Sequence, residues 1–136
     1  MVVKYLLDTD ICIYLIKNKP KHMVDRFLAH KPGEIGISAI SLAELRLGVE
    51  KSQFPEKNQL ALESMLRPIE VLPFDEGAAM TYGEIRKSLE KAGTPRGAMD
   101  YLIAAHSLSI EATLVTNNER EFKRVKGLKI ENWLKQ

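Results

Sequence analysis

Short apolar runs that end at polar residues recur along the chain, and the first of them sets the pattern. Residues 2–7 are apolar or aromatic at five of six positions, and the run stops at Asp8. A strand with one solvent-exposed face alternates between apolar and polar residues, whereas a strand covered on both faces does not. We therefore expect a strand in the middle of a parallel sheet, ending at Asp8.

The rest of the chain alternates between strand-like and helix-like patterns. Strand signals cover 34–38, 69–72, 112–116 and 128–130. Helical spacing of apolar residues, or helix-end signals from proline and glycine, cover 11–18, 20–30, 41–50, 55–66, 75–91 and 97–108. This order predicts an α/β fold with a mostly parallel central sheet and helices on both faces.

Length and composition place the chain among ordinary globular proteins. With 136 residues, 45% of them apolar and 28% charged, it is expected to form a single domain, 1–136. No apolar stretch approaches the roughly 20 residues that span a bilayer, and the N-terminus has no signal-peptide pattern, so we expect no membrane contact and a cytoplasmic location. Cys12 is the single cysteine, which excludes an internal disulfide.

The histidines offer no metal site or catalytic pair. None has a second histidine or a cysteine at metal-ligand spacing, so we expect His22 and His30 on the surface. His106 lies about 240° around its predicted helix from Asp100, because six residues separate them at 3.6 per turn. We expect His106 to be a packing or surface residue.

Three acids stand where strands end or helices begin. Asp8 follows the first strand, Glu44 falls in the predicted first turn of 41–50, and Asp100 opens the apolar helix 97–108. In parallel α/β sheets, ligands bind beyond the carboxyl ends of the strands, so these acids are candidates for one site. Each also has a purely structural explanation: Asp8 as a helix cap, Glu44 as the partner of Ser41 in a capping box, and Asp100 as a charge at a helix N-terminus.

A polar group after the strand 112–116 adds oxygen donors to the same edge. It contains Asn118 and Glu121. Carboxylates and amides without histidine suit Mg²⁺ or Mn²⁺, whereas zinc normally recruits His or Cys. Such a site serves phosphoryl chemistry. The alternative is a non-catalytic α/β binding or signalling module whose acids are helix caps.

Four stretches together resemble the PIN-domain ribonucleases, and in particular the VapC toxins of bacterial toxin-antitoxin pairs. They are Leu-Leu-Asp-Thr-Asp at 6–10, Ile-Ser-Leu-Ala-Glu-Leu at 40–45, Gly-Thr-Pro-Arg-Gly-Ala-Met-Asp-Tyr-Leu-Ile-Ala-Ala-His at 93–106 and Leu-Val-Thr-Asn-Asn-Glu-Arg-Glu-Phe at 114–122. The resemblance implies a PIN-like three-layer sandwich and a Mg²⁺- or Mn²⁺-dependent endoribonuclease that cuts structured RNA. A tRNA is the expected substrate, with the anticodon stem-loop of initiator tRNA the favourite.

The resemblance also implies partners and residue roles. A VapB-type antitoxin would neutralise the protein in a toxin-antitoxin hetero-oligomer, and the toxin itself would be a homodimer. The expected metal ligands are Asp8, Glu44, Asp100 and Asn118, with Glu121 as a further catalytic candidate. Many family members carry Asp where this chain has Asn118, so one metal ion is expected rather than two.

Two threonines and four basic residues complete the expected site. Thr9 and Thr116 are expected to orient a ligand or water. The candidates for RNA contact lie in two basic groups of the sequence, although such side chains are more often simply solvated: Arg96, Arg120, Lys123 and Arg124.

Overall fold

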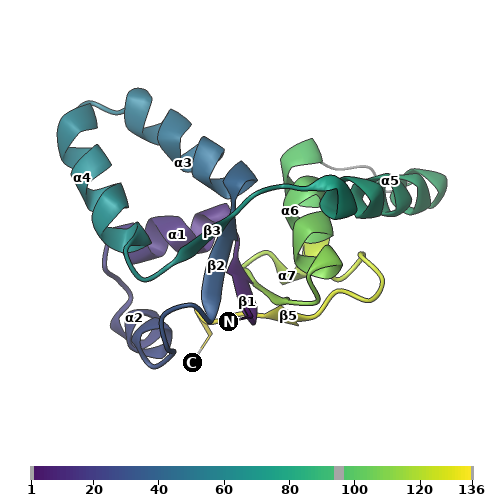
Figure 1. Ribbon diagram of the computed structural model, residues 1–136, viewed down its shortest axis with the longest axis horizontal. Coiled ribbons are helices and arrows are strands. Elements are labelled where there is room, and N and C mark those ends of the chain that lie inside the picture. The colour runs from purple at the N-terminus through teal and green to yellow at the C-terminus, as the bar shows by residue number, and fades with distance from the viewer. Residues whose placement is uncertain (1, 94–96, 136) are drawn as a thin grey trace.

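The computed structural model describes residues 2–93 and 97–135 and contains one parallel sheet (Figure 1). Its five strands lie in the order β3-β2-β1-β4-β5. Their bounds are β1 Tyr5–Leu7, β2 Ile35–Ser38, β3 Glu70–Leu72, β4 Thr113–Val115 and β5 Ile130–Glu131. The first strand therefore occupies the centre of the sheet, as its uninterrupted apolar pattern predicts.

Helices connect the strands and cover both faces of the sheet. Their bounds are α1 Thr9–Ile16, α2 Lys21–Leu28, α3 Ala39–Glu50, α4 Pro55–Leu66, α5 Glu76–Lys91, α6 Ala98–Ser109 and α7 Glu119–Phe122. In Figure 1 the pair α3 and α4 extends on one side of the strands, and the pair α5 and α6 extends on the other. The predicted α/β fold with a parallel sheet is confirmed. Among the described residues, no helix is both long and apolar enough to cross a membrane.

Neighbouring residues of the central strands feed two separate cores. Leu7 and Val115 belong to a core with side chains of α1, α2, α3 and α4, while Leu6 and Leu114 belong to one with α5, α6 and α7. All four side chains are fully buried. Successive strand residues point to opposite faces, so a strand between two helical layers must be apolar at consecutive positions. The expected three-layer sandwich follows directly.

The strand order creates a crevice between β1 and β4. The chain adds β2 and β3 on one side of β1 and then crosses to place β4 on the other. Ligand sites of open α/β sheets lie beyond the carboxyl ends of the strands at such a reversal. Asp8 follows β1 and Thr116 follows β4, so both flank this crevice.

The start of α3 differs from its prediction. The helix begins at Ala39, and the N-cap is Ser38, whose hydroxyl accepts a hydrogen bond from the Ile40 N–H at 3.1 Å. Ser41 is instead buried inside the helix. The predicted Ser41 cap and capping box are therefore wrong, and Glu44 lies beyond the first turn of the helix.

The histidines near the N-terminal half also differ from their prediction. His30 is not a free surface residue, because its ring stacks on Trp133 at a centroid distance of 5.1 Å and contacts Tyr5 at 4.8 Å. His22 is partly buried, and its Nε2 donates to the Leu134 carbonyl at 2.7 Å. Both histidines bind the C-terminal residues to α2. The expectation that they lie outside any metal motif is unaffected.

Candidate active site

Asp8 is buried at the carboxyl end of β1, and both of its oxygens are engaged. Only 6% of the residue is exposed. Oδ1 accepts a hydrogen bond from the Ile11 N–H at 2.9 Å, which caps α1, and Oδ2 accepts one from the Thr116 hydroxyl at 2.5 Å. The capping interpretation of Asp8 is therefore confirmed. The contact with Thr116 joins β1 to β4 across the crevice and goes beyond a cap.

Burial makes the charge of Asp8 costly. The pKa of Asp8 is raised from 3.8 to about 6, chiefly because burial removes water from the carboxylate. The hydrogen bonds from Thr116 and Ile11 oppose this rise, and the negative charges of Asp10 and Asp100 add to it. A cation beside Asp8 would favour the ionised form and remove the penalty.

Glu44 reaches the end of β1 from α3. Its Oε1 accepts a hydrogen bond from the Thr9 hydroxyl at 2.6 Å, so α3 is joined to the first turn of α1. Thr9 and Asp8 are adjacent in sequence, so this contact brings Glu44 to the end of β1. Glu44 therefore lies at the sheet edge, as expected, although it does not cap a helix.

Asp100 lies in the first turn of α6 and faces other acids. Its pKa is raised, first by burial and then by the negative charges of Glu44, Asp10 and Glu121. Acids from α1, α3, α6 and α7 thus act on one another across a common space. We refer to Asp8, Asp10, Glu44, Asp100 and Glu121 as the acidic cluster.

The expected metal site did not include Asp10. It lies within the Leu-Leu-Asp-Thr-Asp stretch, two residues after Asp8, and its charge acts on both Asp8 and Asp100. The repetition of an acid at this spacing was the available signal.

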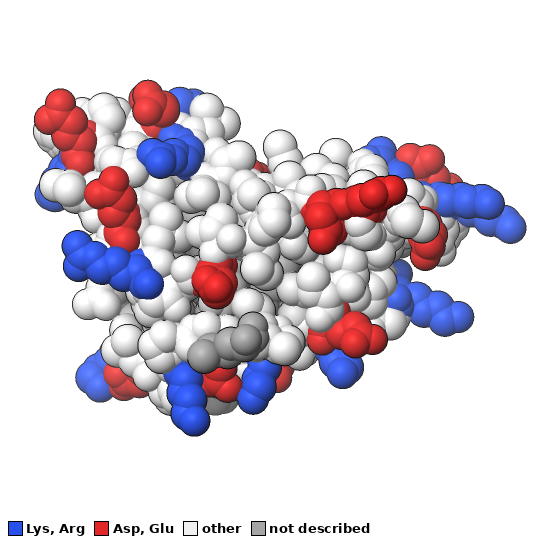
Figure 2. Space-filling model, in the orientation of Figure 1, with Lys and Arg blue, Asp and Glu red and all other residues white. Residues whose placement is uncertain are grey.

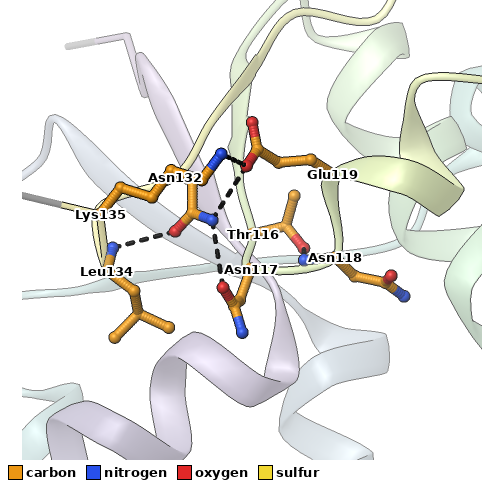
Figure 3. Close-up of polar contacts among 7 residues, drawn as sticks. All are labelled: Thr116, Asn117, Asn118, Glu119, Asn132, Leu134 and Lys135. Atoms are coloured by element: carbon orange, nitrogen blue, oxygen red, sulfur yellow. Dashed lines mark hydrogen bonds and ion pairs between the residues drawn. The ribbon is translucent and has the colours of Figure 1, made fainter.

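Thr116 connects the acidic cluster to the turn after β4. The residue is fully buried, its hydroxyl donates to Asp8, and the same oxygen accepts the Asn118 backbone N–H at 2.9 Å. Figure 3 shows that the Asn118 side chain points away from the group formed by Asn132 and its partners. Among the described residues the Asn118 side chain does not cap α7. Thr116 therefore holds Asn118 through its backbone N–H and not through its side chain.

The donor chemistry of the acidic cluster fits a hard divalent cation. It offers carboxylate oxygens, with hydroxyl and amide groups beside them, and burial together with mutual repulsion raises the pKa of Asp8 and of Asp100. No Lys or Arg within 2–93 and 97–135 forms an ion pair with Asp8, Glu44 or Asp100. In the same ranges, no three His, Cys, Asp or Glu side chains are already arranged to hold an ion. Binding would therefore require side-chain rotation.

Two other reactive groups lie outside this chemistry. Cys12 is buried, and burial beside the Asp8 charge raises the pKa of its thiol, so it stays protonated and inert. His106 is buried too, with Nδ1 2.7 Å from the Ser38 hydroxyl and its ring edge-on to Phe74. Burial lowers the pKa of His106. The prediction that it is a packing residue is confirmed.

The basic candidates for RNA contact are spread over the end of the chain. Arg120, Lys123 and Arg124 are exposed on and after α7, the helix that carries Glu121. Arg96 lies outside the described residues. Figure 2 shows acidic and basic side chains interspersed around the face in view, without a continuous basic tract across it.

Comparisons with known proteins agree with this arrangement. The model of the PIN domain family matches residues 5–128, which include every member of the acidic cluster. The chain belongs to the PIN domain family.

Within the PIN domain family, the chain is similar to VapC proteins and to structures of VapBC complexes. The chain is 46% identical over 132 residues to the tRNA(fMet)-specific endonuclease VapC of Shigella flexneri, covering 97% of this chain and 99% of the relative. A structure of DNA-bound VapBC from Salmonella typhimurium superposes with a TM-score of 0.92 at 45% identity, covering 97% and 99% of the two chains. A structure from the VapBC family of toxin-antitoxin systems, VapBC-5 of Mycobacterium tuberculosis, superposes with a TM-score of 0.70 at 25% identity, covering 96% and 97%. The resemblance to VapC toxins is confirmed.

Proposed function

We propose that this protein is a metal-dependent endoribonuclease toxin, acting as one domain over 1–136. The observation that carries the proposal is the acidic cluster beyond the carboxyl end of β1, where burial first, and then the charges of neighbouring carboxylates, raise the pKa of Asp8 and Asp100. Helix capping accounts for one oxygen of Asp8 but not for Glu44 or Asp100. Uncompensated acids of this kind serve a function rather than stability.

Asp8, Glu44 and Asp100 are the residues that would hold Mg²⁺ or Mn²⁺, with Asn118 as a neutral fourth ligand and Glu121 nearby. The bound ion would supply activation of water and stabilisation of the leaving oxygen in phosphodiester hydrolysis. Thr116 fixes the rotamer of Asp8, and Thr9 fixes that of Glu44. These two hydrogen bonds reduce the side-chain rotation that binding an ion would still require.

A tRNA is the proposed substrate, with tRNA(fMet) first. The support is the similarity to the Shigella flexneri endonuclease across nearly the whole of both chains. Arg120, Lys123 and Arg124, together with Arg96, are the basic residues proposed to contact the phosphates around the scissile bond. Arg120, Lys123 and Arg124 are exposed on and after α7, the helix that carries Glu121, which suits a substrate that brings its negative charge to a bound cation.

The proposed partner is a VapB-type antitoxin, in a hetero-oligomer with a homodimer of this chain. The support is the similarity to solved VapBC assemblies. Asp8, Glu44 and Asp100, which form no ion pair with Lys or Arg among the described residues, attract Arg or Lys as they attract a metal ion. We therefore propose that an antitoxin side chain of this kind enters the acidic cluster and excludes the ion.

Cleavage of tRNA(fMet) by the purified chain tests the proposed activity. We expect cutting in Mg²⁺ or Mn²⁺, none in excess EDTA, and products with a 5′-phosphate and a 3′-hydroxyl, since water is the attacking group. Cutting that survives EDTA, or products with 2′,3′-cyclic ends, would contradict the metal mechanism. Cleavage confined to mRNA or rRNA would contradict the choice of substrate.

Copurification tests the partner. We expect the antitoxin complex to bind Mn²⁺ more weakly than the free protein and to cut no RNA. A complex with unchanged Mn²⁺ affinity would contradict insertion into the acidic cluster. Light scattering on the free protein measures the proposed dimer.

A further inference from the structure

The last residues of the chain grip both sides of the turn after β4. The Asn132 side-chain amide donates to Asn117 Oδ1 and to Glu119 Oε2, each at 3.1 Å, and Lys135 Nζ lies 2.7 Å from the same Glu119 oxygen. Figure 3 shows these four side chains converging on one point. We call Asn117, Glu119, Asn132 and Lys135 the C-terminal clamp.

Contacts with the body of the protein fix the C-terminal half of the clamp. Trp133 lies between Asn132 and Lys135 in sequence, is 1% exposed, and stacks on His30. Its Nε1 donates to Glu131 Oε1 at 2.9 Å, and Arg26 binds the same oxygen at 3.0 Å. The segment is therefore anchored to α2 and to the sheet before it reaches the turn.

Asn132 is itself held in a fixed orientation. Its Oδ1 accepts the Leu134 N–H at 3.0 Å, which leaves the amide nitrogen directed at the turn. The assignment of oxygen and nitrogen follows from this hydrogen bond, because a backbone N–H can only donate.

The clamp sorts the polar residues of the turn. Asn117 and Glu119 are held on the clamp side, whereas the Asn118 side chain points away from it (Figure 3). Two residues further on, Glu121 acts on Asp100 and so belongs to the acidic cluster. Asn117 and Glu119 thus belong to the clamp, whereas Asn118 points away from it and Glu121 belongs to the acidic cluster.

Two hydrogen bonds connect the clamped turn to Asp8. The Asn118 N–H, between the two gripped residues, donates to Thr116 Oγ1, and that hydroxyl donates to Asp8 Oδ2. The clamp also keeps the Glu119 charge paired with Lys135, and the pKa of Glu119 is lowered by Lys135 and Asn132. A displaced Glu119 would add another negative charge beside Glu121.

We propose that Asn132 and Lys135 are positioning residues. They hold the turn after β4 so that Thr116 and Asn118 face the acidic cluster and Glu121 stays within it. The proposal rests on the proposed function of that cluster. Both residues lie beyond 5–128, the part of the chain matched by the family model, whereas their partners Asn117 and Glu119 lie within it.

Replacing Asn132 with Asp tests the clamp with little change in shape. The new side chain still accepts the Leu134 N–H, but it presents a carboxylate to Glu119 in place of a donor. We expect a loss of about 10-fold in kcat, a KM within about 2-fold of wild type, and Mn²⁺ binding weakened about 10-fold, because groups that orient metal ligands have effects of this size. Amide hydrogen exchange across 116–122 should accelerate.

A second substitution should reverse the defect. Glu119→Gln places a side-chain NH₂ opposite the new carboxylate, so the double variant Asn132→Asp, Glu119→Gln regains the hydrogen bond with its polarity reversed. We expect its kcat to return to within about 3-fold of Glu119→Gln alone. Lys135→Met should act in the same direction as Asn132→Asp, more weakly, while Lys57→Met on α4 should leave exchange, Mn²⁺ binding and kcat unchanged.

Three outcomes would overturn the proposal. Unchanged exchange at 116–122 in Asn132→Asp would mean that the clamp does not hold the turn. Faster exchange with wild-type Mn²⁺ affinity and kcat would mean that the turn does not position the site. Failure of the Glu119→Gln rescue would remove the direct contact as the cause. If the wild-type protein cuts no RNA, the proposed function fails, and the exchange and Mn²⁺ measurements still decide for or against the clamp.

Discussion

The acidic cluster and the C-terminal clamp lie on the two sides of the same turn and treat their carboxylates in opposite ways. In the clamp, Glu119 has Lys135 and Asn132 as partners, and its pKa is lowered. In the acidic cluster, Asp8 and Asp100 are crowded by burial and by other acids, and their pKa values are raised. A carboxylate therefore stabilises the fold in the clamp, whereas the carboxylates of the acidic cluster oppose it.

This difference separates structural from functional polar groups. A clamp that satisfies its own hydrogen bonds and charges needs no ligand. In the proposed function, a cation completes the carboxylates of Asp8, Glu44 and Asp100, which have no Lys or Arg partner among the described residues. The raised pKa values of Asp8 and Asp100 support that proposal, and the lowered pKa of Glu119 fits a structural role.

The largest expected effect comes from replacing Asp8 with Asn. Asn caps helices about as well as Asp, so α1 should persist, while RNA cleavage should fall by at least about 100-fold because a metal ligand is lost. Without metal, the variant should be at least as stable as wild type, since a costly buried charge is removed. Melting curves and cleavage rates on one preparation measure both quantities.

The matched control for that substitution is Asp25→Asn, which alters an exposed ion pair with Lys21. It should leave cleavage unchanged. A folded Asp8→Asn protein that cuts RNA at the wild-type rate would remove Asp8 from the site.

The raised pKa of Asp8 predicts an unusual pH dependence of stability. Because the folded protein holds this proton more tightly than the unfolded chain does, the contribution of Asp8 to the free energy of unfolding should fall as pH rises from about 4 to about 6. The loss is on the order of 3 kcal/mol at most, from a shift of 3.8 to about 6. Urea titrations without metal, compared between wild type and Asp8→Asn, isolate it.

Saturating Mg²⁺ should remove most of that dependence, since a bound cation favours the ionised carboxylate. A wild-type profile that matches Asp8→Asn at every pH would show that Asp8 titrates normally.

Replacing Thr116 with Val should cost about 1–3 kcal/mol of unfolding free energy, because the Asn118 N–H and one Asp8 oxygen lose their partner. Cleavage should also fall, since the Asp8 rotamer is no longer fixed. Thr116→Ser keeps the hydroxyl and is the control. A Thr116→Val protein as stable as wild type would show that the hydroxyl is dispensable.

The smallest expected effect is on the ion pair between Glu119 and Lys135, which is partly exposed. Lys135→Met should lower the melting temperature by no more than about 2 °C.

The contribution of Glu119 to the free energy of unfolding should have the opposite sign to that of Asp8. Its lowered pKa stabilises the fold at neutral pH, and this stabilisation is lost as the pH falls through the lowered pKa. Comparing the pH profiles of Lys135→Met and wild type checks the sign.

The central strand and the main acids could be predicted because their signals are local. An apolar run that ends at Asp8 and an acid opening a buried helix at Asp100 are visible within a few residues. The three-layer arrangement followed from the alternation of such runs with helical patterns.

The α3 start and the stack around His30 could not be predicted in the same way. Ser38 both ends β2 and caps α3, with no residue between strand and helix, so the cap falls three residues before the predicted Ser41, where it also meets His106 from α6. His30 packs between Tyr5 and Trp133, which are distant in sequence. The four-residue helix α7 is too short to show a period.

The pairing of β1 with β4 sets the point during synthesis at which a new chain can acquire the proposed RNA-cleaving activity. β1 needs Thr113–Val115 as its neighbour, and Asp8 needs Thr116. Synthesis proceeds at about 5–20 residues per second, so Asp8 leaves the ribosome several seconds before these partners. Comparing RNA cleavage by chains stalled before and after residue 116 would show the chain length at which activity appears. The first 115 residues can therefore be translated before Asp8 has its Thr116 partner, and the proposed antitoxin has that time to be at hand.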